Sequence, residues 1–288
     1  MSARWVVLGA GGMLGHDVLR ALRDRDAVGL ARRDVDITDE AAVLDAVAGA
    51  DVVVNCAAWT AVDDAEAHEL EALAVNGIGA EHVAHACART GARLVHVSTD
   101  YVFAGDAATP YAEDAPVAPR TAYGRTKAVG EEAVRRLLPD RSLVVRTAWL
   151  YGAAGPSFVR TMARLERERD TVDVVDDQQG QPTWSQDLAE RIVAAVDHDV
   201  EPGIYHGTNA GATTWFGLAR AVFELLGADP ERVRPTTSDA FVRPAPRPAY
   251  SVLGHDAWVR AGLAPMRPWR DALDAAFADD NFRRSLSS

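Results

Sequence analysis

Apolar positions follow two alternating patterns through the first half of the chain. Short apolar runs begin at residues 5, 51, 93 and 142, and their length is typical of buried strands. Between them, apolar residues recur every three or four positions, as on one face of an amphipathic helix. This alternation over residues 1–150 predicts an α/β fold with a mainly parallel sheet that carries helices on both faces.

The first predicted strand, residues 5–8, runs directly into a glycine-rich turn and then into a helical pattern. Gly9, Gly12 and Gly15 have a G-x-x-G-x-x-G spacing around Ala10, Gly11, Met13 and Leu14. Glycines at this position allow a tight turn and close backbone approach to a pyrophosphate, which the N-terminus of the helix then faces. The strand–glycine–helix context favours a dinucleotide site over a plain strand–helix turn.

The alternation weakens after residue 150. Helical patterns occur at 158–169, 188–196, 215–226 and 269–277, with short strands at 172–177 and 203–206, and we expect the tail from residue 279 to fray. The sequence therefore predicts a Rossmann-like, doubly wound parallel sheet with a smaller C-terminal substrate-binding lobe. We assign residues 1–152 to the nucleotide-binding domain, to which some later segments return, and residues 153–288 mainly to the lobe.

The second predicted strand ends near residue 30, and Arg32 and Arg33 follow it. A carboxylate near this position would hold the ribose 2′-hydroxyl of NAD, whereas arginines can hold the 2′-phosphate of NADP. This favours NADPH, with NADH and a simple solvated turn left open. Asp36 and Ile37 are placed to border the adenine.

Tyr123 and Lys127 are four residues apart on a predicted helix from 123 to about 138, so both side chains share one face. An ammonium near a phenol favours the phenolate, and we expect it to lower the pKa of Tyr123. The pair could then exchange a proton with a carbonyl or hydroxyl group. The chain has 30 Lys and Arg residues, of which Lys127 alone is lysine, and lysine differs from arginine in its tunable pKa.

Composition excludes several other classes. The net charge of −12 argues against a broad nucleic-acid surface, and the longest apolar runs are too short to span a membrane. The two cysteines match no metal or disulfide spacing, which favours the cytoplasm. No metal site is predicted.

Several longer strings resemble the dTDP-4-dehydrorhamnose reductase family, within the extended short-chain dehydrogenase/reductase superfamily. They begin at Asn55 (NCAAWTAVD), Val97 (VSTDYVF), Tyr123 (YGRTK) and Arg146 (RTAWLYG). The resemblance covers nearly the whole chain, and Ser-Thr-Asp-Tyr-Val-Phe is its most specific local signal.

The resemblance implies a dTDP-4-keto-6-deoxy sugar as substrate and hydride transfer from the nicotinamide to its C4. It makes Tyr123 the proton donor, Lys127 the residue that holds the nicotinamide ribose, and Thr99 a partner of the keto oxygen. Asp100, Tyr101 and Trp149 would line the sugar pocket, and Arg243 or Arg247 would face the diphosphate or nucleotide. The dinucleotide would be surrounded by Gly9, Gly12, Met13, Leu14, Gly15, Arg32, Asp36, Ile37, Ala57, Ala58 and Asn76, together with Tyr123 and Lys127.

Some members of the family form magnesium-bridged dimers through a glutamate on the first helix. This chain has Gly15-His16-Asp17-Val18 there, so the metal is not carried over, and a monomer or a homodimer is expected. A sister reductase that makes another deoxysugar, such as a streptose-like sugar, is the close alternative. A non-catalytic NADP-binding subunit is the alternative from another class.

Overall fold

The computed structural model describes residues 3–286 and contains one six-stranded parallel sheet in the order β10-β5-β4-β3-β1-β2. Its strands are β1 (Trp5–Leu8), β2 (Ala27–Leu30), β3 (Val52–Asn55), β4 (Arg93–Thr99), β5 (Ser142–Thr147) and β10 (Gly203–His206). The chain passes from β1 to β2 on one side and then to β3 on the other side of β1. This reversal creates the crevice at the carboxyl ends of the strands where open α/β sheets bind ligands. The predicted α/β class and parallel sheet are confirmed.

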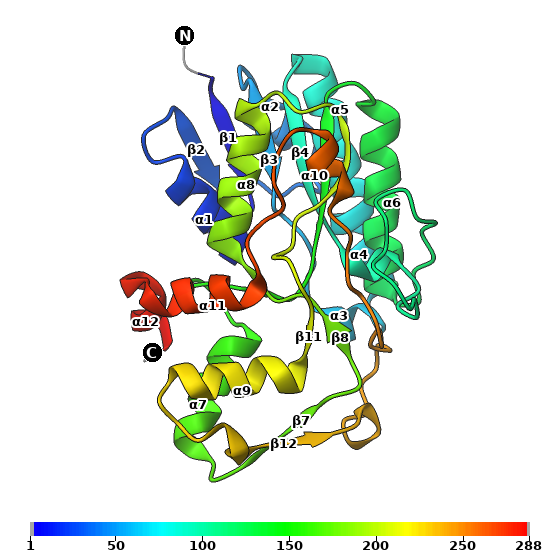
Figure 1. Cartoon of the computed structure of the whole chain (residues 1–288). Helices are drawn as coiled ribbons and strands as arrows, with labels where there is room; N and C mark the ends of the chain where they lie inside the picture. Colours follow the sequence, from blue (N-terminus) through cyan, green and yellow to red (C-terminus); the bar gives the residue numbers. More distant parts are fainter. Residues whose placement is uncertain (1–2, 287–288) are drawn as a thin grey trace.

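Alternate residues of the strands pack against helices on opposite faces. Trp5 and Val7 join a core with α1 (Met13–Ala21) and α8 (Ser185–Asp197), whereas Val6 and Leu8 join a second core. The second core is made with α2 (Glu40–Ala46), α5 (Ala80–Thr90) and α6 (Ala122–Leu137). Figure 1 shows the sheet between these two helical layers. Such near-continuous apolar strands are expected when both faces of a parallel sheet are covered.

A smaller lobe lies beyond the carboxyl ends of the strands (Figure 1). It has its own core, which Val159, Trp184, Phe223 and Leu273 share with other apolar side chains. Its helices are α7 (Phe158–Glu168), α9 (Trp215–Leu225), α11 (Trp269–Ala278) and α12 (Asp280–Leu286). Its short strands are β6 (Leu150–Tyr151), β7 (Val172–Val175), β8 (Gln179–Gly180), β9 (Thr183–Trp184), β11 (Thr213–Thr214) and β12 (Val233–Thr236).

Three segments from the second half return to the nucleotide-binding part, as the sequence suggested. Strand β10 pairs with β5, helix α8 packs against α1, and α10 (Asp256–Arg260) lies against β10. These three segments join the second half of the chain to the sheet and to the helices beside it.

Residues 69–90 do not form one continuous helix, because a π-helical turn at Ala74–Gly79 separates α4 (Glu69–Leu73) from α5. Residues 280–286 of the tail form α12, so the prediction of fraying is wrong there; residues 287 and 288 lie outside the described part of the chain. Phe282 of this helix is buried in the lobe core, and Arg20 on α1 binds Asp279 across 2.7 Å.

Candidate active site

Helix α6 carries Tyr123 and Lys127 into the crevice at the carboxyl end of the sheet. Its start is fixed by two side chains: Thr121 Oγ1 accepts a hydrogen bond from Gly124 N, and Glu66 Oε1 accepts one from Ala122 N. A side chain added at Gly124 would meet the Tyr101 carbonyl oxygen at 2.2 Å, so glycine is needed for this approach. Because both contacts lie within the first turn of α6, they set the position of Tyr123 against β4.

Lys127 is a buried charged group, with only 2% of its surface exposed. Its Nζ donates a 2.7 Å hydrogen bond to the carbonyl oxygen of Val97 on β4. Burial lowers its pKa to about 8, while the carboxylate of Glu131, one turn further along α6, acts in the opposite direction. Lys127 is therefore a fixed point charge with a proton that it can release near neutral pH.

The pKa of Tyr123 is raised to about 12, chiefly by burial, with a smaller rise from the charge on Asp100. A hydrogen bond with Thr99 acts in the opposite direction. The expectation of a pKa lowered by Lys127 is wrong for this structure, because desolvation of the phenolate dominates and the group that opposes it is Thr99. Tyr123 is thus held as a neutral phenol, which is the form that can donate a proton.

Thr99 ends β4 and lies between Tyr123 and Asp100. Its hydroxyl donates to Asp100 Oδ1 at 3.0 Å and accepts from the backbone N–H of Tyr101 at 3.2 Å. The Tyr101 ring meets the Tyr123 ring edge to face, with 5.6 Å between centroids. These contacts bring together the predicted residues of α6 and of the loop after β4.

The glycine turn after β1 forms a backbone cradle that suits a dinucleotide. Gly9 has a φ of +78°, and a Cβ there would lie 2.6 Å from Ala57 N at the end of β3. Helix α1 begins after Gly12, and no side chain caps the amides of its first turn. Gly11 and Gly12 are exposed. A pyrophosphate can approach these amides closely, and the positive end of the helix dipole favours it.

Other predicted cofactor residues divide between the rim of this cradle and the core. Met13, Ala57 and Ala58 are partly exposed at the rim. Leu14 and Ile37, by contrast, are buried core side chains, and Gly15 packs against the carbonyl oxygen of Gly9. Leu14, Gly15 and Ile37 could therefore contact a nucleotide only through their backbone atoms.

Arg32 lies in the open beyond β2, with 82% of its side chain exposed and its Nε 3.5 Å from Asp36 Oδ2. The Asp36 carboxylate accepts from both the amide and the hydroxyl of Thr38, and the amide is the main cause of its lowered pKa. Because Asp36 is held by Thr38, the Arg32 guanidinium keeps most of its donors for another anion. This arrangement fits a 2′-phosphate at the edge of the nucleotide site.

Asn76 lies in the π-helical turn and is almost fully buried. Its amide accepts from Trp59 N at 2.8 Å and donates to Trp59 O and to Thr126 Oγ1, both at 3.1 Å. It therefore connects the loop after β3 to the first turns of α6. Asn76 holds the cofactor side of the site together.

Trp149 is fixed in an unusual backbone conformation, with a φ of +47°. Its ring stacks on Trp215 at the start of α9, with 3.5 Å between centroids and 9° between planes. A Cβ added at Gly180 would come within 2.5 Å of the Trp149 ring. The paired rings form a flat, rigid apolar wall that joins the end of β5 to the C-terminal lobe.

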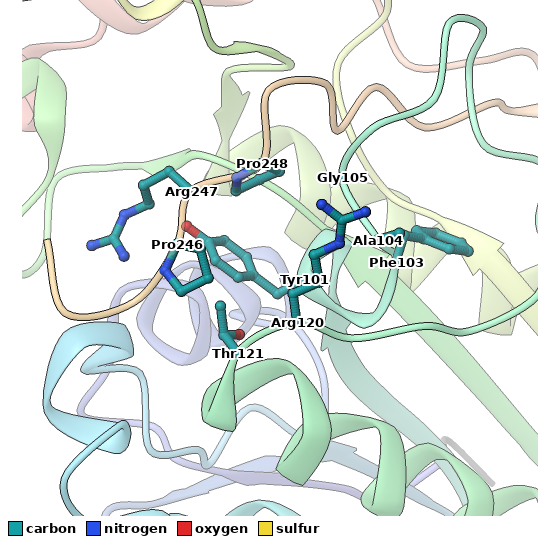
Figure 2. A pocket seen from close by; sticks show the side chains of 9 residues that line it. All are labelled: Tyr101, Phe103, Ala104, Gly105, Arg120, Thr121, Pro246, Arg247 and Pro248. Atoms are coloured by element: carbon teal, nitrogen blue, oxygen red, sulfur yellow. The ribbon is translucent and has the colours of Figure 1, made fainter. Parts of the chain in front are cut away.

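A small cavity lies between the loop after β4 and the segment 246–248. Figure 2 shows Tyr101, Arg120 and Thr121 near its base and Pro246, Arg247 and Pro248 across it. The Arg247 guanidinium points away from the Tyr101 ring (Figure 2) and donates to Asp63 Oδ2 at 2.7 Å. Arg243 is exposed nearby, and its charge contributes to the lowered pKa of Asp63.

Three residues at this site escaped sequence reasoning: Asp63, Trp215 and Ser251. Asp63 binds Arg247, Trp215 stacks on Trp149, and Ser251 faces the carboxyl of Asp100. Asp63 ends the string that begins at Asn55 and resembles the family, which was a signal for it, whereas nothing marked Trp215. Within residues 3–286, no group of three or more His, Cys, Asp or Glu side chains is placed to hold a metal ion, and no helix is long and apolar enough to cross a bilayer.

Comparison with known proteins decides the family. The model of the RmlD substrate binding domain matches residues 3–282. A dTDP-4-dehydrorhamnose reductase of Streptomyces griseus is 57% identical over 282 residues, covering 95% of this chain and 93% of that protein. The chain belongs to the dTDP-4-dehydrorhamnose reductase family.

Two further members of the family inform the substrate and the cofactor. A dTDP-4-keto-6-deoxy-D-glucose reductase of Streptomyces niveus is 55% identical, covering 96% of this chain and 97% of that protein. The crystal structure of a dTDP-4-dehydrorhamnose reductase from Bacillus anthracis, in complex with NADP, has a TM-score of 0.92 at 36% identity. It covers 96% of this chain and 98% of that one. The predicted Rossmann-like fold is that of the family.

Proposed function

We propose that this chain is an NADPH-dependent reductase of a dTDP-4-keto-6-deoxy sugar, most simply the dTDP-4-dehydrorhamnose reductase that forms dTDP-L-rhamnose. The observation that carries the proposal is the packing of Tyr123 against the loop that follows Thr99, one helical turn from the buried Lys127, beside a glycine cradle at the same edge of the sheet. The names of the relatives supply the sugar nucleotide, and the NADP complex supports the cofactor.

Tyr123 is the proton donor. Bound NADPH supplies a hydride to C4 of the ketone, and the oxygen must gain one proton for the product to be an alcohol. Burial keeps the Tyr123 phenol neutral, and its hydroxyl already lies in a hydrogen-bonded position beside Thr99. General acid catalysis of this kind contributes on the order of 10²–10⁴-fold to the rate.

Lys127 lies one turn after Tyr123 on α6 and assists the proton transfer. Its ammonium is anchored to Val97 O, which leaves two of its three donors for a ribose hydroxyl and for the oxygen of Tyr123. A positive charge there stabilises the phenolate that remains after proton transfer. Lys127 therefore both positions the nicotinamide ribose and stabilises charge after the transfer.

The substrate-binding residues come from both parts of the chain. Tyr101 and the Trp149–Trp215 wall offer apolar faces on which a sugar ring can lie. Arg120 and Arg247 are the cations that line the cavity of Figure 2, and guanidinium forks suit a diphosphate. Arg243 is exposed on the same segment as Arg247 and could contact the outer part of the nucleotide. Asp100, at 3% exposure, lies behind Thr99, so its carboxyl acts through that hydroxyl.

A second 4-keto sugar is the competing substrate. The relative named for dTDP-4-keto-6-deoxy-D-glucose is 55% identical, against 57% for the dTDP-4-dehydrorhamnose reductase, so identity does not separate the two activities. Both substrates carry the same nucleotide and the same C4 ketone. A non-catalytic subunit is disfavoured because Tyr123, Lys127 and Thr99 are all present and in place.

The test is NADPH oxidation at neutral pH with dTDP-4-keto-L-rhamnose and, separately, with dTDP-4-keto-6-deoxy-D-glucose. We expect turnover of the first with a higher kcat/KM than the second. The reverse order would assign the chain to the sister activity, and tight NADPH binding without turnover of either would refute the reductase function.

We place the enzyme in the cytoplasm, as a monomer or homodimer. Gel filtration with and without NADPH tests the oligomeric state.

A further inference from the structure

Asp100 is the buried acid nearest the proposed proton donor, and its hydrogen bonding is incomplete. Its side chain is 3% exposed; Oδ1 accepts from Thr99, whereas Oδ2 has no hydrogen-bond partner among residues 3–286. A fully ionised carboxylate normally has several partners when it is buried. A carboxyl group with one oxygen left over is better suited to a change of protonation state.

The direction of the Thr99 hydroxyl depends on that protonation state. Thr99 has one proton to donate, and an ionised Asp100 can only accept, so the Thr99 proton goes to Asp100. The Thr99 oxygen then faces Tyr123 as an acceptor, and Thr99 has no proton left for a substrate ketone. If Asp100 is protonated, its own O–H can donate to Thr99, which releases the Thr99 proton toward the site.

Ser251 connects this carboxyl to the C-terminal half of the chain. Its buried hydroxyl, like Asp100 Oδ2, has no hydrogen-bond partner among residues 3–286, and it lies close enough to Asp100 to lower the pKa of that carboxyl. The backbone N–H of Ser251 donates to the Gln179 carbonyl oxygen at 2.9 Å. The backbone N–H of the preceding residue, Tyr250, donates to the carbonyl oxygen of Gly105. These two backbone hydrogen bonds fix the position of Ser251 beside Asp100.

We propose that Asp100 is a positioning residue that sets the direction of the Thr99 hydroxyl, with Ser251 as its partner: neutral Asp100 directs the Thr99 proton to the substrate ketone, and ionised Asp100 withdraws it. This inference rests on the proposed function. It differs from a role for Asp100 in lining the sugar pocket, because the carboxyl acts through Thr99 without touching the sugar.

The surroundings give the expected pH dependence. Burial raises the pKa of Asp100 to about 6, while Ser251, Thr99 and the backbone amides of Asp100 and Tyr101 act in the opposite direction. The titratable groups that face it are Tyr101 and, from α6, Tyr123, and its charge raises the pKa of both. The active form of the enzyme has a protonated Asp100. We therefore expect kcat to be at its maximum below the pKa of Asp100 and to fall as the pH rises through that pKa.

The experiment measures kcat against pH from 5 to 9 for the wild type, Asp100→Asn and Ser251→Ala. Asparagine imitates the neutral acid, because its NH₂ group donates to Thr99 while its oxygen accepts from Ser251. We expect Asp100→Asn to keep kcat within about threefold of the low-pH wild type and to lose the fall. Ser251→Ala should move the fall to higher pH with the same plateau, because it removes a hydroxyl that lowers the pKa of Asp100. As a matched control, Ser142→Ala removes a buried serine hydroxyl that binds Leu138 O, and it should leave the profile unchanged.

Two readouts separate this inference from the reductase function itself. Turnover by the wild type at one pH tests the function. Infrared difference spectra of the wild type minus Asp100→Asn, recorded at a series of pH values without substrate, report the protonation state of the Asp100 carboxyl. We expect a carboxylic-acid band that disappears as the pH rises past about 6 and persists to higher pH in Ser251→Ala. An unchanged kcat–pH profile in folded Asp100→Asn, loss of its kcat at every pH, or no such band would each overturn the proposal.

Discussion

Arg247 binds Asp63 across 2.7 Å, and this ion pair joins the short helix α3 (Val62–Ala65), which follows β3, to the proline-rich segment that lines the cavity. Asp63 also accepts from the backbone N–H of Ala245, so one carboxylate anchors two points of that segment. The contact places a guanidinium at the border between the cofactor side and the substrate side. Its donors are directed at Asp63, and a diphosphate would have to share or replace that partner.

We predict that Arg247→Met raises the KM for the dTDP-sugar at least tenfold and changes kcat by less than threefold. The reason is that uniform binding energy is lost from a part of the substrate remote from the reacting carbon. Steady-state kinetics with saturating NADPH provide the measurement. Arg164→Met is the control, since Arg164 pairs with Glu168 on the surface of α7. An unchanged KM in Arg247→Met would leave the diphosphate to Arg243.

Tyr123→Phe removes the phenolic hydroxyl and leaves the ring. We predict a loss in kcat on the order of 10²–10⁴-fold, because the proton donor is gone, with the Kd for NADPH within a few-fold of the wild type. Single-turnover rates and fluorescence titration of NADPH check the two halves of this prediction. A kcat near the wild-type value would remove Tyr123 from the mechanism.

Lys127→Arg keeps the positive charge but replaces a compact ammonium with a planar fork. The ammonium is buried against Val97 O, and this space does not fit a guanidinium. We predict weaker NADPH binding and at least a 100-fold loss of kcat/KM. Lys127→Met, which matches the lysine stem more closely, should fold at least as stably as the wild type at pH 7 and still be inactive. Full activity of Lys127→Arg would contradict the point-charge argument.

The stability of α6 depends on a buried ion pair behind Lys127. Arg146 and Glu131 are both nearly inaccessible and form a two-pronged contact at 2.7 and 2.9 Å. We predict that Glu131→Met lowers the free energy of unfolding by about 3–5 kcal/mol, because an unpaired guanidinium is left buried. The double variant Glu131→Met with Arg146→Met should recover most of that loss in urea unfolding. A double variant no more stable than the single one would show that the Arg146 charge is not the cause.

Arg32 provides the test of cofactor preference. We predict that Arg32→Ser raises the KM for NADPH at least fivefold while the KM for NADH stays within about twofold, because only NADPH has the 2′-phosphate that the guanidinium would bind. Arg23→Ser is a matched control, since Arg23 is also exposed and its contact is with the adjacent Asp24. Equal changes for both cofactors would place Arg32 outside the 2′-phosphate site.

The sequence predicted best those features that depend on neighbouring residues in the chain. The glycine turn after β1 and the Tyr123–Lys127 spacing are local patterns, and each occupies the predicted position on its strand or helix. The parallel sheet followed from apolar runs that recur with helical patterns between them. These features need little information about distant contacts.

The features that sequence reasoning missed depend on contacts between distant segments. Asp63 and Arg247 lie in different parts of the chain, and so do Trp149 and Trp215. Neither pairing follows from a local period. The prediction of a lowered Tyr123 pKa failed for a similar reason, because the burial that raises this pKa depends on how the loop after β4 packs against α6.

The π-helical turn at Ala74–Gly79 can be understood as one residue more than a regular helix requires. Each residue of an α-helix turns the chain by about 100°. Deleting one residue before Asn76 would restore a regular helix between α4 and α5. The deletion would either rotate the Asn76 amide away from Trp59 and Thr126 or, if Asn76 kept its place, disrupt α4. The irregular turn therefore orients the Asn76 side chain at the cost of regular helical hydrogen bonds. Shortening it by a residue would be expected to yield a protein whose helix is more ideal and whose cofactor loop has lost its attachment.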